Sequence, residues 1–125
     1  MSEAETLEGV KVLVVEDETI VAMLLEQMLE ELECEVAGVA GQLNQAMELA
    51  RTVDAEVAIL DLNLSGQRVD PVAAILAERE VPFIFASGYG EDGLSPQFRG
   101  RPVLPKPFRL DQLRDALIGA AGARG

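Results

Sequence analysis

The chain of 125 residues contains no histidine, no tryptophan and a single cysteine, Cys34. The absence of histidine excludes Ser-His-Asp and Cys-His catalysis as well as histidine-ligated zinc. A lone cysteine cannot form an internal disulfide, which fits a reducing cytoplasmic compartment, and Cys34 is most simply a small core residue. No apolar run is long enough to span a bilayer, and the polar, acidic residues 1–8 do not resemble a signal peptide.

Basic residues are also scarce, since 10 Lys and Arg face 22 Asp and Glu, which gives a formal net charge of -12. Such a chain is repelled by phosphate backbones and by anionic lipid surfaces, so we expect no nucleic-acid partner and no membrane partner. Aromatic residues make up only 4% of the chain, whereas hydrophobic residues make up 49%. The composition therefore predicts one domain with a largely aliphatic core.

Short apolar runs alternate with amphipathic stretches along the chain. The expected strands are residues 10–15, 34–39, 56–60, 82–86 and 102–104. Apolar residues recur at helical spacing within residues 21–32, 43–50, 72–76 and 110–120. Near-continuous hydrophobicity is typical of strands buried on both faces, so the pattern predicts an α/β fold with a parallel sheet and right-handed crossovers.

The stretch between the last two expected strands differs from the other connections. Residues 90–100 include three glycines and one proline, which predict a fourth helix that is short or irregular. Two apolar residues there, Leu94 and Phe98, form either a docking patch or a cover over the sheet edge. We expect a flexible arm at 1–8, one domain at 9–121, a frayed tail at 122–125 and no output domain.

Five polar side chains fall at or just after the ends of expected strands. Glu16 and Asp17 follow the first strand, Asp61 the third, Ser87 the fourth and Lys106 the fifth. Loops at the carboxyl ends of strands build the site of an open parallel sheet, so these residues are expected to converge.

Oxygen ligands from this group suit Mg²⁺, which takes few carboxylates and keeps several waters. Asp17 and Asp61 would supply two direct ligands, and the main-chain carbonyl of Asn63 a third. Glu16 would act directly or through a bound water. Asp17 has a simpler alternative role, because aspartate often caps the helix that follows it.

Asp61 is the candidate nucleophile, since a carboxylate can accept a phosphoryl group to form an acyl phosphate. Lys106 and the cation would neutralise charge on the phosphoryl oxygens, and the Ser87 hydroxyl would donate a hydrogen bond to one of them. Ser87 could instead be an ordinary turn residue, and Lys106 a surface lysine between prolines.

These residues lie in four motifs that together resemble the receiver domain of two-component response regulators, over essentially the whole folded length. The motifs are Val14-Val15-Glu16-Asp17-Glu18, Ile59-Leu60-Asp61-Leu62-Asn63, Phe85-Ala86-Ser87-Gly88 and Leu104-Pro105-Lys106-Pro107-Phe108. The resemblance implies a doubly wound five-stranded parallel sheet of order 2-1-3-4-5, a requirement for Mg²⁺ and a cis Lys106–Pro107 peptide.

The resemblance also implies a function. The chain is expected to be a single-domain, cytoplasmic response regulator, a monomer or weak homodimer. Asp61 would accept phosphate from a sensor histidine kinase or histidine phosphotransfer protein. It would signal to an unknown downstream protein by contact or by onward phosphotransfer. Self-catalysed phosphorylation and dephosphorylation would be slow at most, so the chain would not be an enzyme.

Two other functions compete with this reading. The first is a receiver-like binding module that is never phosphorylated. The second is a small phosphatase, which Asn63 opposes, because such enzymes generally place a second acid two residues after the nucleophile. A match to the dinucleotide-binding pattern at residues 88–93 is dismissed, since its inner Glu91 and Asp92 would oppose a pyrophosphate.

Several positions depart from the family pattern. Residues 85–90 resemble the "FAT GUY" receiver subgroup, with Ser87 in place of its threonine. Val103 replaces the usual tyrosine or phenylalanine, so a rotating ring cannot act there. Leu64-Ser65-Gly66-Gln67 replaces the usual Met-Pro. We expect the signal output to differ from that of standard receivers.

Tyr89, two residues after Ser87, is expected to shield the phosphoryl group from water. The Tyr89→Ala variant should therefore lose its phosphoryl group faster than the wild type does. Autodephosphorylation rates of the two phosphorylated proteins provide the measurement, and an unchanged or slower rate in the variant would reject the shielding role.

Overall fold

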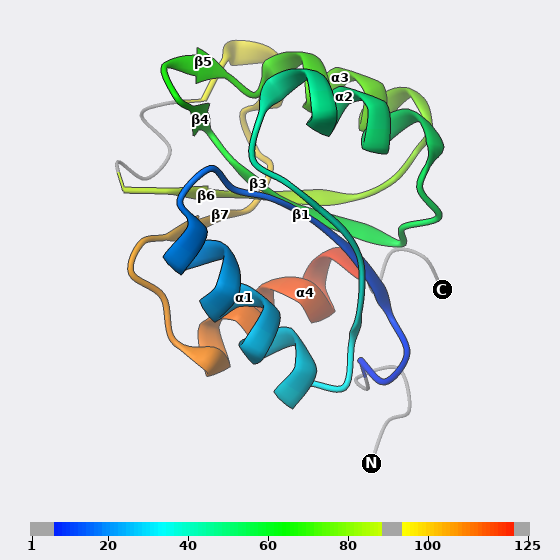
Figure 1. Ribbon diagram of the computed structural model, residues 1–125, viewed down its shortest axis with the longest axis vertical. Coiled ribbons are helices and arrows are strands. Elements are labelled where there is room, and N and C mark those ends of the chain that lie inside the picture. Colours follow the sequence, from blue (N-terminus) through cyan, green and yellow to red (C-terminus); the bar gives the residue numbers. More distant parts are fainter. Residues whose placement is uncertain (1–6, 89–93, 122–125) are drawn as a thin grey trace.

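The computed structural model describes residues 7–88 and 94–121. Its main sheet contains five parallel strands: β1 (Lys11–Val15), β2 (Glu35–Ala40), β3 (Val57–Asp61), β6 (Phe83–Ser87) and β7 (Val103–Pro105). Their order across the sheet is β2-β1-β3-β6-β7 (Figure 1). When these five strands are numbered by themselves, this is the expected order 2-1-3-4-5, so the predicted fold is confirmed.

Two layers of helices enclose the sheet. The helices are α1 (Thr19–Glu31), α2 (Leu43–Thr52), α3 (Asp70–Glu78) and α4 (Leu110–Ala121). Figure 1 shows α1 and α4 on one face of the sheet and α2 and α3 on the other. Each helix buries apolar side chains against the sheet, although Leu24, within the expected apolar stripe at 21–32, is 46% exposed. Because each helix has an apolar side to bury, helices cover both faces of the sheet.

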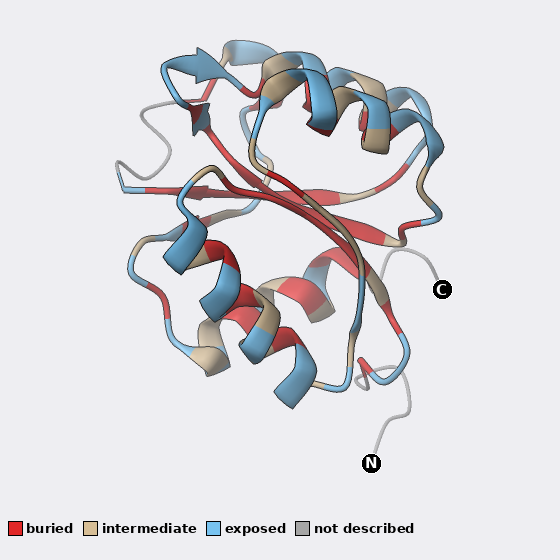
Figure 2. Ribbon diagram, viewed as in Figure 1, coloured by how far each residue is buried: buried red, intermediate tan, exposed pale blue. Residues whose placement is uncertain are grey.

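The central strand β3 serves both layers in turn. Val57 and Ile59 pack in the cluster with α1 and α4, whereas Ala58 and Leu60 pack in the cluster with α2 and α3. Every residue of β3 is buried (Figure 2). Because successive side chains of a strand point to opposite faces, each position in β3 is committed to one layer. The edge strand β2 is more exposed, and burial on both faces does not extend to it.

The connection from β6 to β7 contains only one short 3₁₀ helix among its described residues, η3 (Pro96–Phe98). A short or irregular fourth helix was expected, and this is what the structure has. Leu94 and Phe98 are buried, so they cover the core and do not form an exposed patch. The Phe98 ring centroid lies 5.9 Å from that of Phe83 and 5.8 Å from that of Phe85.

A small antiparallel hairpin after β3 was not expected from the sequence. It pairs β4 (Asn63–Leu64) with β5 (Gln67–Arg68). The two residues between them, Ser65 and Gly66, have φ angles of 51° and 85°. Positive φ at both loop positions is the geometry of primed hairpin turns, and a Ser-Gly dipeptide is a recognised turn signal.

The start of the described chain packs against the core. Leu7, which falls within the expected 1–8 arm, is only 6% exposed and packs in the cluster with α1 and α4. The amide of Val10 donates a hydrogen bond to the Leu7 carbonyl. The packed part of the described chain therefore includes Leu7. Across residues 7–88 and 94–121, no helix has the length and apolar character needed to cross a membrane.

The aromatic contacts of Phe98 predict a large contribution to stability. Phe98→Ala should lower the free energy of unfolding by about 2–4 kcal/mol, since it leaves a cavity beside Phe83 and Phe85. Phe98→Leu, the control, should lose clearly less because it keeps most of the apolar volume. Urea unfolding of the three proteins gives the comparison, and a loss below about 1 kcal/mol in the alanine variant would contradict this packing role.

Candidate functional site

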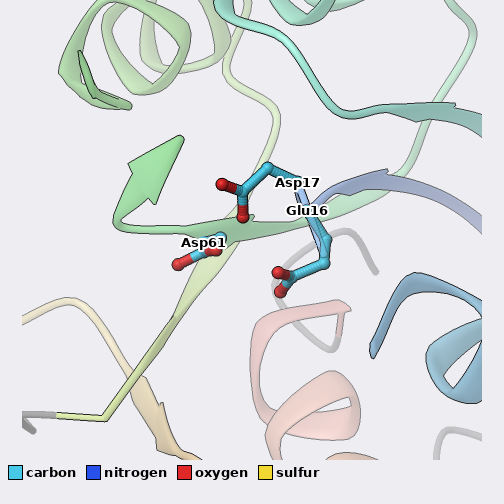
Figure 3. A group of neighbouring side chains, drawn as sticks. All are labelled: Glu16, Asp17 and Asp61. Atoms are coloured by element: carbon cyan, nitrogen blue, oxygen red, sulfur yellow. The ribbon is translucent and has the colours of Figure 1, made fainter. Parts of the chain in front are cut away.

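Four strand ends bring the predicted site residues to one edge of the sheet. Glu16 and Asp17 directly follow β1, Asp61 ends β3, Ser87 ends β6 and Lys106 directly follows β7. The strands β1 and β3 are hydrogen-bonded neighbours, so their carboxylates are adjacent. Figure 3 shows the three acidic side chains gathered where these two strands end. The predicted convergence of the four strand ends is thus what the structure has.

The three carboxylates form a tight cluster. One oxygen from each of Glu16, Asp17 and Asp61 lies within 4.8 Å of the others. Glu16 is 3% exposed and Asp61 is 8% exposed, whereas Asp17 is half-buried. Three negative charges at this separation repel one another strongly when water is excluded. The cluster therefore needs cations.

Lys106 supplies one of these cations. Its Nζ lies 3.0 Å from Glu16 Oε1 and 3.3 Å from Asp61 Oδ2, so a single ammonium joins both buried carboxylates. Burial alone would lower the pKa of Lys106, but its contacts with Glu16 and Asp61 raise the pKa above its ordinary value. The lysine is consequently charged at neutral pH, and it is not a free surface lysine.

The backbone around Lys106 fixes its direction. The Lys106 amide donates a 2.9 Å hydrogen bond to the carbonyl of Ser87, which couples the two strand ends. The peptide between Lys106 and Pro107 is cis, as the resemblance implied. Ser87 is 3% exposed, so it is buried at the end of β6 and is not among the residues that line the hollow described below.

Asp61 remains poorly compensated in spite of Lys106. Burial, and then the charge of Glu16, raise the pKa of Asp61 to about 7, although Lys106 acts in the opposite direction. The backbone amide of Asn63 donates a long hydrogen bond of 3.4 Å to Asp61 Oδ1, which stabilises the ionised carboxylate only weakly. One ammonium therefore does not neutralise the three carboxylates, and a second positive charge would further stabilise the cluster.

Asp17 has a different environment. Its Oδ2 accepts hydrogen bonds from the Ser65 amide at 2.8 Å and from the Ser65 hydroxyl at 3.2 Å. Burial acts to raise the pKa of Asp17, but hydrogen bonds with the Ser65 amide, with Asp61 and with the Ser65 hydroxyl together hold the pKa below its ordinary value. The alternative role as a helix cap is not seen, since no side chain caps α1, a helix that lies wholly within the described chain.

These residues fit a hard divalent cation. Asp17 and Asp61 line an open hollow of about 480 Å³, together with Asn63, Ser65 and Lys106 among others. Carboxylate oxygens at a solvent-filled opening are the donors that Mg²⁺ uses, since it keeps several of its waters. Glu16 is not among the residues that line the hollow, although one of its oxygens lies within 4.8 Å of oxygens from Asp17 and Asp61. Asn63 lines it, but its side-chain oxygen already accepts a hydrogen bond from the Gly66 amide at 2.8 Å.

Ser65 is the residue of this site that was not anticipated. Its Ser-Gly turn was visible in the sequence, but nothing local indicated that the turn would meet Asp17, which lies 48 positions away. Tyr89, the expected water shield, and residues 89–93 of the dismissed dinucleotide pattern lie outside the described residues.

Comparison with known proteins decides the family. The family model described as "Response regulator receiver domain" matches residues 12–118. The chain belongs to the response regulator receiver family. This receiver domain is similar to the solution structure of SdrG from Sphingomonas melonis, with 40% identity and a TM-score of 0.80. The match covers 98% of this chain and 99% of SdrG.

Two curated bacterial relatives are longer proteins. PdtaR of Mycobacterium tuberculosis is 29% identical over 111 residues, covering 86% of this receiver domain and 54% of PdtaR. PhyR of Methylorubrum extorquens is 35% identical over 104 residues, covering 79% of this receiver domain and 39% of PhyR. The chain thus spans about half the length, or less, of these relatives.

The unfavourable environment of the Asp61 carboxylate yields a prediction for stability. Asp61→Asn removes a charge that the fold disfavours, so without divalent cations at about pH 8 it should raise the free energy of unfolding by about 1–3 kcal/mol. The unfolded carboxyl loses its proton near pH 4, and the folded one near pH 7. The wild type should therefore lose stability as pH rises through this window, and the advantage of the variant should vanish below it.

Urea unfolding in the presence of a chelator, repeated at several pH values, measures both effects. Asp115→Asn is the matched control, because Asp115 has 69% side-chain exposure on α4 and should leave the unfolding free energy nearly unchanged. If Asp61→Asn were destabilising at about pH 8, the argument from unbalanced charge would be wrong.

Proposed function

We propose that this receiver domain accepts a phosphoryl group on Asp61 and passes the signal on through protein contact or onward phosphotransfer. The observation that carries the proposal is the Lys106 ammonium between the Glu16 and Asp61 carboxylates, beside Asp17, at an open hollow. A nucleophile, a fixed ammonium and oxygen ligands are the parts that phosphoryl transfer to a carboxylate needs.

Asp61 would attack the phosphorus of a phosphohistidine. The new bond joins an Asp61 oxygen to phosphorus, while the bond from phosphorus to the donor nitrogen breaks and its electron pair returns to the imidazole. The Lys106 ammonium, whose Nζ lies 3.3 Å from Asp61 Oδ2, would neutralise the negative charge that develops on the phosphoryl oxygens. The Ser87 hydroxyl would donate a hydrogen bond to one of these oxygens.

We further propose Mg²⁺ as the cofactor, held by Asp17, Asp61 and the main-chain carbonyl of Asn63. Glu16, which is not among the residues that line the hollow, would contact the ion directly or through a bound water. When bound, the ion neutralises negative charge on the carboxylates and on the phosphoryl oxygens. Because the pKa of Asp61 is raised to about 7 in the protein alone, a cation would also favour its ionised form at neutral pH.

The proposed partners are a sensor histidine kinase or a histidine phosphotransfer protein as donor, and a downstream protein as receiver of the signal. The sequence Phe85-Ala86-Ser87-Gly88-Tyr89-Gly90 supports placement in the "FAT GUY" subgroup. Val103 supports an output without a rotating aromatic ring, because it occupies that position in β7. The competing function is a receiver-like binding module that is never phosphorylated.

Chemical phosphorylation distinguishes the two functions. Incubation with acetyl phosphate and Mg²⁺ should add the mass of one phosphoryl group to the wild type and nothing to Asp61→Asn. Asp115→Asn, which removes an exposed aspartate far from the hollow, should be labelled like the wild type. Intact-protein mass spectrometry gives the result, and a chelator should prevent labelling. An unlabelled wild type would favour the binding module.

A further inference from the structure

The β4–β5 hairpin makes a direct contact with the acidic cluster. Its turn residue Ser65 donates two hydrogen bonds, from the backbone amide and from the hydroxyl, to the same oxygen of Asp17. Hydrogen bonds to an ionised carboxylate are among the stronger ones in proteins. The contact is therefore strong enough to decide where the Asp17 side chain points.

The hairpin is held in place without any help from Asp17. Leu64 is 1% exposed and packs in the core cluster with α2 and α3. The Val69 amide donates a 3.1 Å hydrogen bond to the Leu62 carbonyl, at the base of the hairpin. At its tip, the Gly66 amide bonds to the Asn63 side chain. The turn therefore holds Ser65 in a fixed position, from which it restrains the rotation of the half-buried Asp17 side chain.

A second set of contacts ties the outer strand of the hairpin to the rest of the domain. Arg68 Nε lies 3.2 Å from Asp70 Oδ1 in the first turn of α3. Arg68 Nη2 donates a 3.2 Å hydrogen bond to Ser95 Oγ, and Ser95 in turn bonds to Asp70. The hairpin is therefore attached both to α3 and to the segment that leads into η3.

We propose that Ser65 is a positioning residue, which holds Asp17 in the orientation that a divalent cation requires. Both Ser65 hydrogen bonds end on Oδ2, so the hairpin does not need the second carboxylate oxygen. Figure 3 shows the side chains of Asp17 and Asp61 next to each other, and one carboxylate oxygen from each lies within 4.8 Å of the other. Cation binding and an intact hairpin turn therefore stabilise each other.

The opposite relation is that Ser65 competes with the cation for Asp17. The fixed hairpin argues against competition, because a preformed ligand orientation spares the cation the cost of ordering Asp17. The inference rests on the proposed cation site but does not require phosphoryl transfer.

Mg²⁺ titration of three variants, followed by calorimetry, tests the role of Ser65. Ser65→Gly removes the hydroxyl but keeps the amide, and glycine accepts the positive φ of 51° readily. We expect its Mg²⁺ dissociation constant to rise about threefold to tenfold. Gly66→Ala strains the turn at φ 85° and should also weaken binding. Gly9→Ala, the matched control, places a methyl at φ 77° in open space far from the site and should bind like the wild type.

Amide hydrogen exchange at Ser65 gives a second readout in the wild-type protein. Positioning predicts slower exchange when Mg²⁺ is added, and competition predicts faster exchange. Unchanged or tighter Mg²⁺ binding by Ser65→Gly, or faster exchange with Mg²⁺, would overturn the inference and leave the proposed function intact. If the wild type bound no Mg²⁺ at all, the proposed cation site itself would fail, and the inference with it.

Discussion

The contact of one ammonium with two buried carboxylates is the interaction on which the site depends. Glu16 and Asp61 leave neighbouring strands at the same edge of the sheet, so the parallel fold forces two like charges together. Lys106 relieves this repulsion only because its amide is tied to Ser87 and its ammonium reaches both acids. The remaining imbalance, seen in the raised pKa of Asp61, makes the site receptive to another cation.

Much of the fold and of the site could be predicted from the sequence. The apolar runs located the strands to within a residue or two, because short, nearly continuous apolar runs between amphipathic stretches are typical of strands in a parallel α/β sheet. The polar residues that end those runs had to meet, since parallel strands deliver their carboxyl ends to one edge. The proximity of Glu16, Asp61 and Lys106 follows from these two facts and needs no knowledge of side-chain conformations.

The parts that escaped prediction are those set by contacts between distant segments. A hairpin of two-residue strands is too short to show a periodic pattern in the sequence. Its Ser-Gly dipeptide indicates that the chain turns there, but not which residues the turn will contact. The bond from Ser65 to Asp17 and the burial of Leu7 both depend on where the packed domain places remote segments. The resemblance to the receiver family implied the strand order, but it said nothing about the structure of residues 64–67, which replace the usual Met-Pro of the family.

The strict alternation along β3 restricts how this domain can change in length. Adding or deleting one residue within the strand would exchange the side chains of the two helical layers, so Ile59 and Leu60 would each face the wrong partners. The same slip would carry Asp61 about 3.3 Å along the strand and turn it to the opposite face, out of reach of Lys106. We therefore expect this domain to tolerate changes of length in its connecting loops and not inside β3.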